Sequence, residues 1–489
     1  MAPHPSPTVP SIENYVGGDW CEPTGETERD VLNPATGDRL TSISFSSQDD
    51  VDEAIEAGLD AFEDWSRQPV EARIQPLFEL KSLLETHQDE LAELLVKDHG
   101  KTFTEAHGEL RRGIENVEVA CGIPTMMQAG TLPNAAPEID ESAVRKPLGV
   151  FAAITPFNFP GMIPLWFLPY AVATGNAFVL KPSERVPLVP QRLVELIEEA
   201  GFPDGVVQLL HGGPDTVNAL CEHPDVAGIS FVGSTPVAKH VYETAAAHGK
   251  RVQAQGGAKN YVIVTESADL EFAAEQTVSS ACACGGERCL ANDVAVVEES
   301  VYEEFADLVV DAAAEQTVGY GLDDGVDIGA LITPEHEQRV REYVDIGLDE
   351  GATMLYDGRD VTVDGYDGNF MGPCVLGGVD PDSTIAQEEI FGPVIGLTAA
   401  ADLDEAIEIL NGTRFGNAAS LFTDRGRDAR EVRHRADVGN LGVNVGTAAP
   451  MAFFHFGGRK DSFFGDLHAQ DEDMIHFYTD ETIYIERWP

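Results

Sequence analysis

Three cysteines lie close together in SSACACGGERCLA, residues 279–291, and supply the most reactive candidate group of the sequence. Their C-x-C-x4-C spacing offers three thiols, whereas a structural zinc site usually takes four ligands, so we predict no metal site here. Cys289 instead follows a Gly-Gly turn and stands next to Arg288. A neighbouring cation lowers the pKa of a thiol and favours the nucleophilic thiolate. Cys289 is therefore a candidate nucleophile, although an isolated cysteine is more often a buried structural residue.

A second group of residues fits a dinucleotide. FVGST, residues 231–235, leads from an apolar run into a helical stretch, where Gly233 allows close backbone approach and the Ser234 hydroxyl suits a pyrophosphate. Lys181 and Glu184 follow another apolar run, and a Glu at the end of such a strand can hold ribose hydroxyls and repel a 2′-phosphate. The glycines that follow the apolar run 206–210, in HGGP (211–214), do not match the usual G-x-G-x-x-G fingerprint. Each of these signals is therefore weak alone.

The elements that must position these groups alternate between strand and helix. Short apolar runs recur at residues 149–155, 177–181, 206–210, 226–232 and 261–265, with helical stretches between them. This alternation predicts βαβ units and a parallel sheet covered on both faces, the architecture of a nucleotide-binding domain. A second alternating region covers about residues 270–440.

The remaining segments give simpler predictions. Residues 50–100 are expected to form two helices, with Ser47 and Asp50 placed as a capping box. Residues 163–180 are apolar but are broken by proline and glycine, which favours a buried helix followed by a strand over a membrane span. The β-branched and aromatic residues of 475–488 predict a late strand, and such strands often pair with another subunit.

Composition limits the classes of partner. The chain has 489 residues, 31 Lys and Arg against 84 Asp and Glu, so 31 − 84 gives a net charge of −53. This excess argues against nucleic acid and anionic membranes as partners. The acids are spread along the chain, which is typical of a halophilic surface solvated in molar salt. Seven cysteines form no even disulfide set, which favours a reducing, cytoplasmic location, and residues 1–15 read as a frayed tail without an apolar leader.

Six separated motifs carry a family resemblance. They are TPFNFP (155–160), LKPSE (180–184), FVGST (231–235), GGAKN (256–260), GERC (286–289) and EEIFGPV (388–394). In this order and spacing they resemble the aldehyde dehydrogenase superfamily, over about residues 15–489. The resemblance implies an α/β fold with a Rossmann-like NAD domain (1–124 and 147–254, with a return at 441–470) and an α/β catalytic domain (255–440). It also implies a small β oligomerisation arm (125–146 and 471–489) in a homodimer or homotetramer.

Within the superfamily, the sequence looks most like the CoA-acylating branch that oxidises methylmalonate semialdehyde. Phe157 stands where most members have Trp, and residues 112–124, 365–373 and 453–466 resemble segments of that branch. Hydrolytic members place a Glu four residues before the motif Lys, where it activates the deacylating water. Counting back from Lys259 gives Gln255, and an amide cannot accept a proton as a carboxylate does.

The resemblance assigns roles to these positions. Cys289 would attack the aldehyde, the Asn158 amide and the Cys289 backbone N–H would hold the oxyanion, NAD would take the hydride and CoA would release the acyl group. Lys181 and Glu184 would then hold the adenine ribose. The other residues expected beside NAD are Phe157, Gly233, Ser234, Gln255, Glu389 and Phe391.

Two arginines refine the implied substrate. Arg112 and Arg288 match positions that bind the carboxylate of a semialdehyde in the family. Arg112 could instead form a structural ion pair, and hydrolytic relatives can also carry a residue of the Arg288 type at that position. The implied products are propionyl-CoA or acetyl-CoA and CO2, and the rival reaction is hydrolysis to a free acid. A non-catalytic protein with the same fold is a further alternative. Glu287, where the branch commonly has Gln, is expected to point into solvent. Cys282 and Cys284 are expected to pack behind the loop, and the alternative for them is a reversible disulfide with Cys289 under oxidation.

Overall fold

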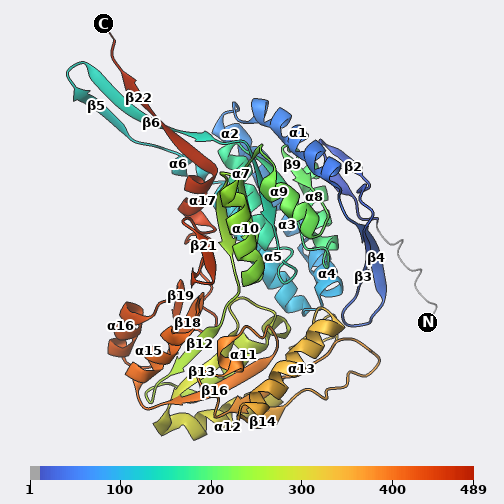
Figure 1. Ribbon diagram of the computed structural model, residues 1–489, viewed down its shortest axis with the longest axis vertical. Helices are drawn as coiled ribbons and strands as arrows, with labels where there is room; N and C mark the ends of the chain where they lie inside the picture. The colour runs from blue at the N-terminus through green and yellow to red at the C-terminus, as the bar shows by residue number, and fades with distance from the viewer. Residues whose placement is uncertain (1–10, 489) are drawn as a thin grey trace.

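The computed structural model describes residues 11–488, and its largest elements are two sheets, one above the other in Figure 1. The upper sheet has eight strands in the order β2-β1-β9-β8-β7-β10-β11-β21. Their bounds are β1 Asn14–Val16, β2 Asp19–Cys21, β7 Val150–Ile154, β8 Ala177–Lys181, β9 Val207–Leu209, β10 Val226–Val232, β11 Arg251–Gln255 and β21 Phe463–Gly465. The central strands, β9 to β11 in this order, are parallel, as the strand and helix alternation predicts.

Alternate residues of each central strand face opposite layers of helices. In β7, Phe151 and Ala153 pack on one side, whereas Val150, Ala152 and Ile154 pack on the other. The first side is covered by α3 (Gln75–Thr86), α4 (Gln88–His99), α5 (Phe103–Ala120), α7 (Ile163–Thr174) and α8 (Leu188–Glu199). The second is covered by α1 (Gln48–Trp65), α9 (Pro214–Glu222) and α10 (Thr235–Ala247).

The lower sheet has seven strands in the order β14-β15-β16-β13-β12-β18-β19, and only β14 runs antiparallel to its neighbour. The bounds are β12 Asn260–Val264, β13 Asn292–Glu298, β14 Thr353–Asp357, β15 Cys374–Gly377, β16 Val394–Ala400, β18 Ala418–Phe422 and β19 Asn440–Val443. One face is covered by α11 (Leu270–Cys282) and α12 (Tyr302–Ala314), the other by α15 (Leu403–Gly412) and α16 (Gly426–Arg435). Both sheets are thus covered on both faces.

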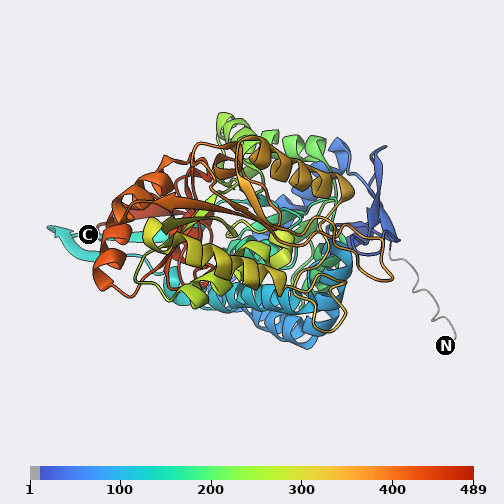
Figure 2. The ribbon, with the colours of Figure 1, turned by 90° about the horizontal axis from the view of Figure 1, so that it is seen from below.

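A three-stranded antiparallel sheet projects from the body, at the upper left of Figure 1 and at the left of Figure 2. It consists of β5 (Thr131–Ala136), β6 (Ile139–Pro147) and β22 (Thr479–Glu486). The strand predicted over 475–488 begins later, because residues up to 478 form α17 (Asp471–Tyr478), which packs on α7. Ile485 and Leu132 are exposed on this arm.

The two-helix prediction for residues 50–100 is wrong, because residues 48–99 form α1, α2 (Val70–Arg73), α3 and α4. His87 ends α3 and begins α4, so one continuous leucine pattern is divided by a bend. The Ser47 and Asp50 capping box is confirmed. The tail predicted for 1–15 falls largely outside the described residues, but Asn14 and Tyr15 belong to β1.

The apolar segment after residue 162 forms the buried helix α7 and then β8, as predicted. Within residues 11–488, no helix is both long and apolar enough to cross a membrane. The remaining elements are β3 (Glu28–Leu32), β4 (Arg39–Ser44), α6 (Ile123–Met126), 3-10 turns at Ala283–Gly286 and Glu299–Val301, α13 (Pro334–Asp349), α14 (Thr384–Gln387), β17 (Phe415–Gly416) and β20 (Arg459–Lys460).

Candidate active site

Cys289 lies just after a tight turn between α11 and β13. The backbone has positive φ at Cys284 (54°), Gly285 (65°) and Gly286 (77°). A Cβ on Gly286 would lie 2.2 Å from the carbonyl carbon of Gly392, so only glycine fits this close approach. The Gly-Gly turn predicted before the nucleophile is therefore a requirement of the packing.

Two amide side chains fix the peptide of the nucleophile. The Cys289 carbonyl accepts hydrogen bonds from Asn260 Nδ2 at 3.0 Å and from Asn417 Nδ2 at 2.7 Å. Asn260 lies in the GGAKN motif, but its role was not predicted, and Asn417 is an isolated residue before β18 that carries no sequence signal. Both asparagines are buried, so they hold the backbone of Cys289 rigidly.

Cys289 borders two cavities. One, of about 810 Å³, lies at the carboxyl ends of the strands of the upper sheet and is also lined by residues that pack around the lower sheet. The other, of about 470 Å³, is lined by residues of α5 and α7 and by the loop that includes Ala449 and Pro450. The half-buried thiol can therefore meet one molecule from each cavity.

The larger cavity collects most of the residues predicted to hold a dinucleotide. Asn158 follows β7, Lys181 is the last residue of β8, and Gly233 follows β10. Parallel strands that end together bring these residues to one edge of the sheet. The predicted residues that line the cavity are Phe157, Asn158, Lys181, Glu184, Gly233, Ser234, Cys289, Glu389 and Phe391.

The chemistry of this lining fits NAD. Ser234 is the N-cap of α10, and its hydroxyl makes no capping hydrogen bond, so the hydroxyl and the helix N-terminus both face a position for a pyrophosphate. Glu184 lies 3.8 Å from Lys181 and 3.4 Å from Arg29, where it can accept ribose hydroxyls. Glu389 accepts from the Ala258 N–H at 2.8 Å, and burial raises its pKa to about 7.

Phe391 is held in a left-handed conformation, with φ 64°. Its carbonyl lies 2.7 Å from His336 Nε2, and its ring meets the Phe157 ring edge to face at 6.0 Å. His336 lies on α13 and also lines the larger cavity. No spacing in the sequence ties His336 to residues fifty positions away, so sequence reasoning missed it.

Asn158 is 4% exposed, and its side chain points toward the turn of the nucleophile. Nδ2 donates one proton to the Glu287 carbonyl at 3.0 Å, which leaves the second proton of the amide for another acceptor. The backbone carbonyl of Asn158 accepts from Lys101 Nζ at 2.7 Å. Lys101 also pairs with Glu109 at 2.5 Å, and both of these side chains are fully buried. This buried pair fixes the amide where an oxyanion beside Cys289 would need it.

Arg288 lowers the pKa of the Cys289 thiol, as predicted, but burial outweighs this effect. Burial raises the pKa of Cys289 to about 11; Arg288 lowers it, but Glu389 raises it further. Desolvation disfavours the thiolate more than one neighbouring cation favours it. The expectation of a thiolate near neutrality in the free protein is therefore wrong.

Glu287 is fully buried, so the expectation that it points into solvent is wrong. The positive-φ turn before it directs the side chain inward, where Oε1 accepts from the Ile332 N–H at 3.1 Å. Its Oε2 lies 3.7 Å from His99 Nε2. Burial raises the pKa of Glu287 well above its usual value, and burial lowers the pKa of His99. The carboxyl is thus held as a neutral acid.

Replacing Glu287 with glutamine is expected to stabilise the protein increasingly as the pH rises above about 4.5. The unfolded carboxyl has a pKa near 4.5, so above that pH folding must bind a proton at Glu287. This costs about 1.4 kcal/mol per pH unit until the folded-state pKa is reached. Glutamine keeps the shape without the cost, so we expect a gain that grows with pH above the unfolded pKa and no gain near or below it.

Urea unfolding in molar KCl at several pH values measures this difference. Glu304→Gln, a change at an exposed acid, is the control and should leave the pH dependence unchanged. A Glu287→Gln gain that is equal at all pH values would contradict a neutral carboxyl.

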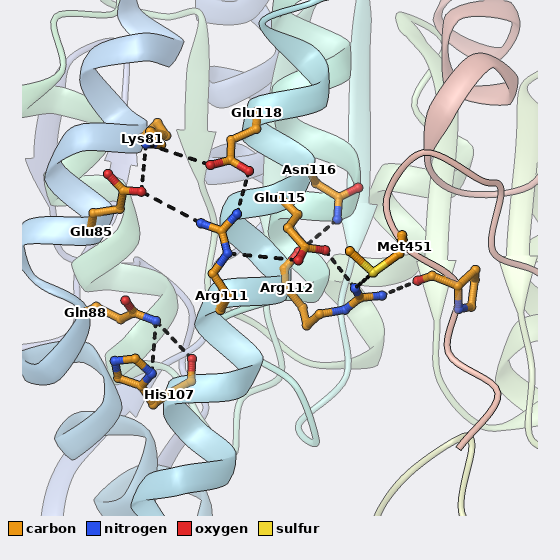
Figure 3. Close-up of polar contacts among 11 residues, drawn as sticks. Lys81, Glu85, Gln88, His107, Arg111, Arg112, Glu115, Asn116, Glu118 and Met451 are labelled. Carbon is orange, nitrogen blue, oxygen red and sulfur yellow. Dashed lines mark hydrogen bonds and ion pairs between the residues drawn. The ribbon is translucent and has the colours of Figure 1, made fainter. Parts of the chain in front are cut away.

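Arg112 and Arg288 both line the smaller cavity together with Cys289. Arg112 also forms the structural ion pair that was the alternative role for it, because its Nη1 lies 2.7 Å from Glu115 Oε2 (Figure 3). Its Nη2 donates to the Pro450 carbonyl. Cys284 lines this cavity as well, whereas Cys282 is buried in the core of the lower sheet, so only Cys282 lies behind the loop as expected.

Gln255 lies apart from the cavity linings. Its side chain is 4% exposed, and Nε2 donates to the Phe456 carbonyl at 3.2 Å. Its neighbours Gly256 and Gly257 line the larger cavity instead. Its predicted contact with a cofactor stays a prediction. Among residues 11–488, no group of three His, Cys, Asp or Glu side chains is placed to hold a metal ion.

Comparisons with known proteins agree with this geometry. The aldehyde dehydrogenase family model matches residues 20–483. Malonate-semialdehyde dehydrogenase 1 of Geobacillus thermodenitrificans is 47% identical over 98% of this chain and 99% of its own. A crystal structure of methylmalonate-semialdehyde dehydrogenase from Oceanimonas doudoroffii superposes with a TM-score of 0.96 at 40% identity over 98% of both chains. A NAD complex from Sinorhizobium meliloti, provisionally described as the same kind of enzyme, gives 0.97 at 39% identity over 99% of both chains.

Proposed function

The chain belongs to the aldehyde dehydrogenase family, and from that premise we propose that it oxidises malonate or methylmalonate semialdehyde with NAD and transfers the acyl group to CoA. The products are acetyl-CoA or propionyl-CoA and CO2. One observation carries the CoA step: an amide, Gln255, occupies the position of the carboxylate that activates water in hydrolytic members. The relatives named above support the choice of substrate.

The first half of the reaction uses Cys289 and Asn158. The Cys289 thiol loses its proton to solvent and its sulfur adds to the aldehyde carbon. The free amide proton of Asn158 and the Cys289 N–H stabilise the oxygen as it becomes negative. Bound NAD supplies the hydride acceptor, so the adduct becomes a thioester on Cys289. The rigid carbonyl of Cys289, held by Asn260 and Asn417, keeps the sulfur in place through these steps.

The second half releases the acyl group from Cys289. The CoA thiolate attacks the thioester carbon, and the Cys289 thiolate leaves. Water competes poorly, because position 255 carries an amide, which cannot accept a proton as a carboxylate does. Of the acids that line the two cavities, Glu109 is held in its pair with Lys101 and accepts from Gly161 N–H. No CoA-binding motif is readable in the sequence, so the CoA site itself is left unassigned.

The substrate carboxylate fits the smaller cavity. Arg288 and Arg112 line it beside the sulfur, and a guanidinium binds a carboxylate bidentately. A carboxylate β to a thioester carbonyl can leave as CO2, because the electrons of the broken carbon–carbon bond delocalise into that carbonyl. A proton then adds to the carbon, which gives the shorter acyl-CoA.

Product analysis tests this proposal. With malonate semialdehyde, NAD and CoA, we expect acetyl-CoA, CO2 and NADH in equal amounts, measured by mass spectrometry and absorbance. Malonate as the product would support the alternative, a dehydrogenase that hydrolyses its thioester to the free acid.

We propose further that the protein works in molar salt in the cytoplasm as a homodimer or homotetramer. The net charge of −53 supports the first point, because at about 1 M salt the Debye length falls to about 3 Å and self-repulsion is screened. All seven cysteines are free thiols, which suits a reducing compartment. Exposed apolar side chains on the β5–β6–β22 arm suit burial against a second copy.

Dialysis into dilute buffer is expected to unfold the protein. Circular dichroism should show cooperative loss of structure as KCl falls well below about 1 M, where acidic residues repel one another over longer distances. An unchanged melting temperature in dilute buffer would contradict the salt requirement.

A further inference from the structure

Arg112, one of the three arginines that line the smaller cavity, already pairs with a carboxylate beside it. On α5, Arg112 and Glu115 are three residues apart and share one face of the helix. Glu115 Oε2 lies 2.7 Å from Arg112 Nη1, and its side chain is only 12% exposed (Figure 3). A half-buried pair at this distance is screened much less than a surface pair.

The Arg112 guanidinium has two further partners. Nη2 donates to the Pro450 carbonyl, and Nη1 also touches Met451 Sδ. Pro450 is part of the wall of the cavity. A carboxylate that enters the cavity therefore meets an arginine whose charge is already paired and three of whose five N–H groups already have partners.

Arg288 is different. Among residues 11–488 it has no ion-pair partner, although it lines the same cavity. The acids that line this cavity are occupied, since Glu109 pairs with Lys101 and Glu105 accepts from the Thr102 and Cys284 N–H groups. Of the three arginines that line the cavity, only Arg288 is uncompensated: Arg112 pairs with Glu115, and Arg111 pairs chiefly with Glu118.

We propose that Glu115 is a specificity-determining residue, an internal anion that competes with the substrate carboxylate for Arg112. This inference rests on the proposed function, because it requires a substrate that carries a carboxylate. When the substrate binds, its carboxylate and Glu115 share one guanidinium and repel each other. Glu115 therefore weakens the binding of semialdehyde acids and keeps the cavity acceptable to uncharged aldehydes.

The variant Glu115→Gln tests this role. Glutamine keeps the side-chain length and a carbonyl oxygen that accepts from Arg112, but it removes the charge. We expect the KM for malonate semialdehyde to fall about tenfold with kcat within about twofold, a change of about one logarithmic unit for one removed charge. The KM for propanal, which has the same chain length and no carboxylate, should stay within about twofold.

The control is Glu118→Gln, three residues further along α5. Glu118 pairs with Arg111 at 2.6 Å and with Lys81 at 3.8 Å, so this variant removes the same charge from the same helix without freeing Arg112. Arg111 also lines the cavity, but it keeps Glu85 at 3.8 Å and Glu115 at 4.0 Å in this variant. It should leave both KM values unchanged. Malonate, an unreactive dianion, gives a second readout: its inhibition constant against propanal oxidation should fall about tenfold in Glu115→Gln and not in Glu118→Gln.

The outcomes separate this inference from the function on which it rests. A wild-type protein that oxidises propanal but not malonate semialdehyde would remove the proposed function. A wild-type protein that forms acetyl-CoA, with an unchanged or higher KM for the semialdehyde in Glu115→Gln, would overturn only the role of Glu115. Should Glu115→Gln fold poorly, Glu115→Asp withdraws the charge by one methylene. Competition then predicts a KM for malonate semialdehyde below the wild-type value, and an unchanged KM would count against it.

Discussion

A variant with alanine in place of Cys289 is expected to form no measurable NADH from any aldehyde. Cys289 borders both cavities, and its carbonyl is fixed by Asn260 and Asn417, so its sulfur is the atom that can receive the aldehyde beside the Asn158 amide. Loss of a nucleophile that forms a covalent intermediate typically lowers the rate by about 10⁴ or more. NADH absorbance measures the rate, and NAD binding by fluorescence should be retained, because the larger cavity keeps its lining.

Cys284→Ser is the matched control. Cys284 lines the same smaller cavity, and its N–H donates to Glu105 at 2.6 Å, a bond that serine retains. This variant should keep a burst of NADH of about one per subunit. A Cys289→Ala protein with a normal burst, or a Cys284→Ser protein without one, would assign the nucleophile to the wrong cysteine.

Replacing Gln255 with glutamate is expected to create hydrolysis that does not need CoA. Gln255 Nε2 donates to the Phe456 carbonyl at 3.2 Å, and a carboxylate cannot make that bond. The new carboxylate must turn from Phe456, and a positioned general base typically contributes a factor of about 10²–10⁴. We expect the steady-state rate of NADH formation without CoA to rise about 10²-fold, with the free acid as product.

Gln253→Glu tests whether position 255 matters. Gln253 lies on the same strand and is fully buried, and its Nε2 donates to Ser230 Oγ at 3.0 Å. A carboxylate there adds the same charge two residues from position 255, and hydrolysis should not rise. No gain from Gln255→Glu would mean that something other than a missing base keeps water from the thioester.

The sequence allowed most of the sheets to be predicted. Apolar runs such as 226–232 became β10 without change, because a strand buried on both faces must be apolar throughout. The strand β11 was missed, since its sequence RVQAQ alternates polar residues that are satisfied inside the body. For example, Gln253 donates to Ser230.

The site was predicted less evenly than the fold. Lys181, Gly233 and Cys289 follow from motifs because each lies at a strand end or a turn with a local signal. Glu287 was misplaced, since only the positive-φ turn shows that its side chain faces inward. The pKa of Cys289 was misjudged for the same reason: a neighbouring arginine is visible in the sequence, whereas desolvation depends on packing.

The central claim is that the thioester on Cys289 waits for CoA. Rapid mixing of enzyme, NAD and malonate semialdehyde, followed at the NADH absorbance, tests it most directly. Without CoA we expect a burst of about one NADH per subunit and then a slow phase; with CoA, the slow phase should become fast turnover. A full steady-state rate without CoA, with no burst, would contradict the claim.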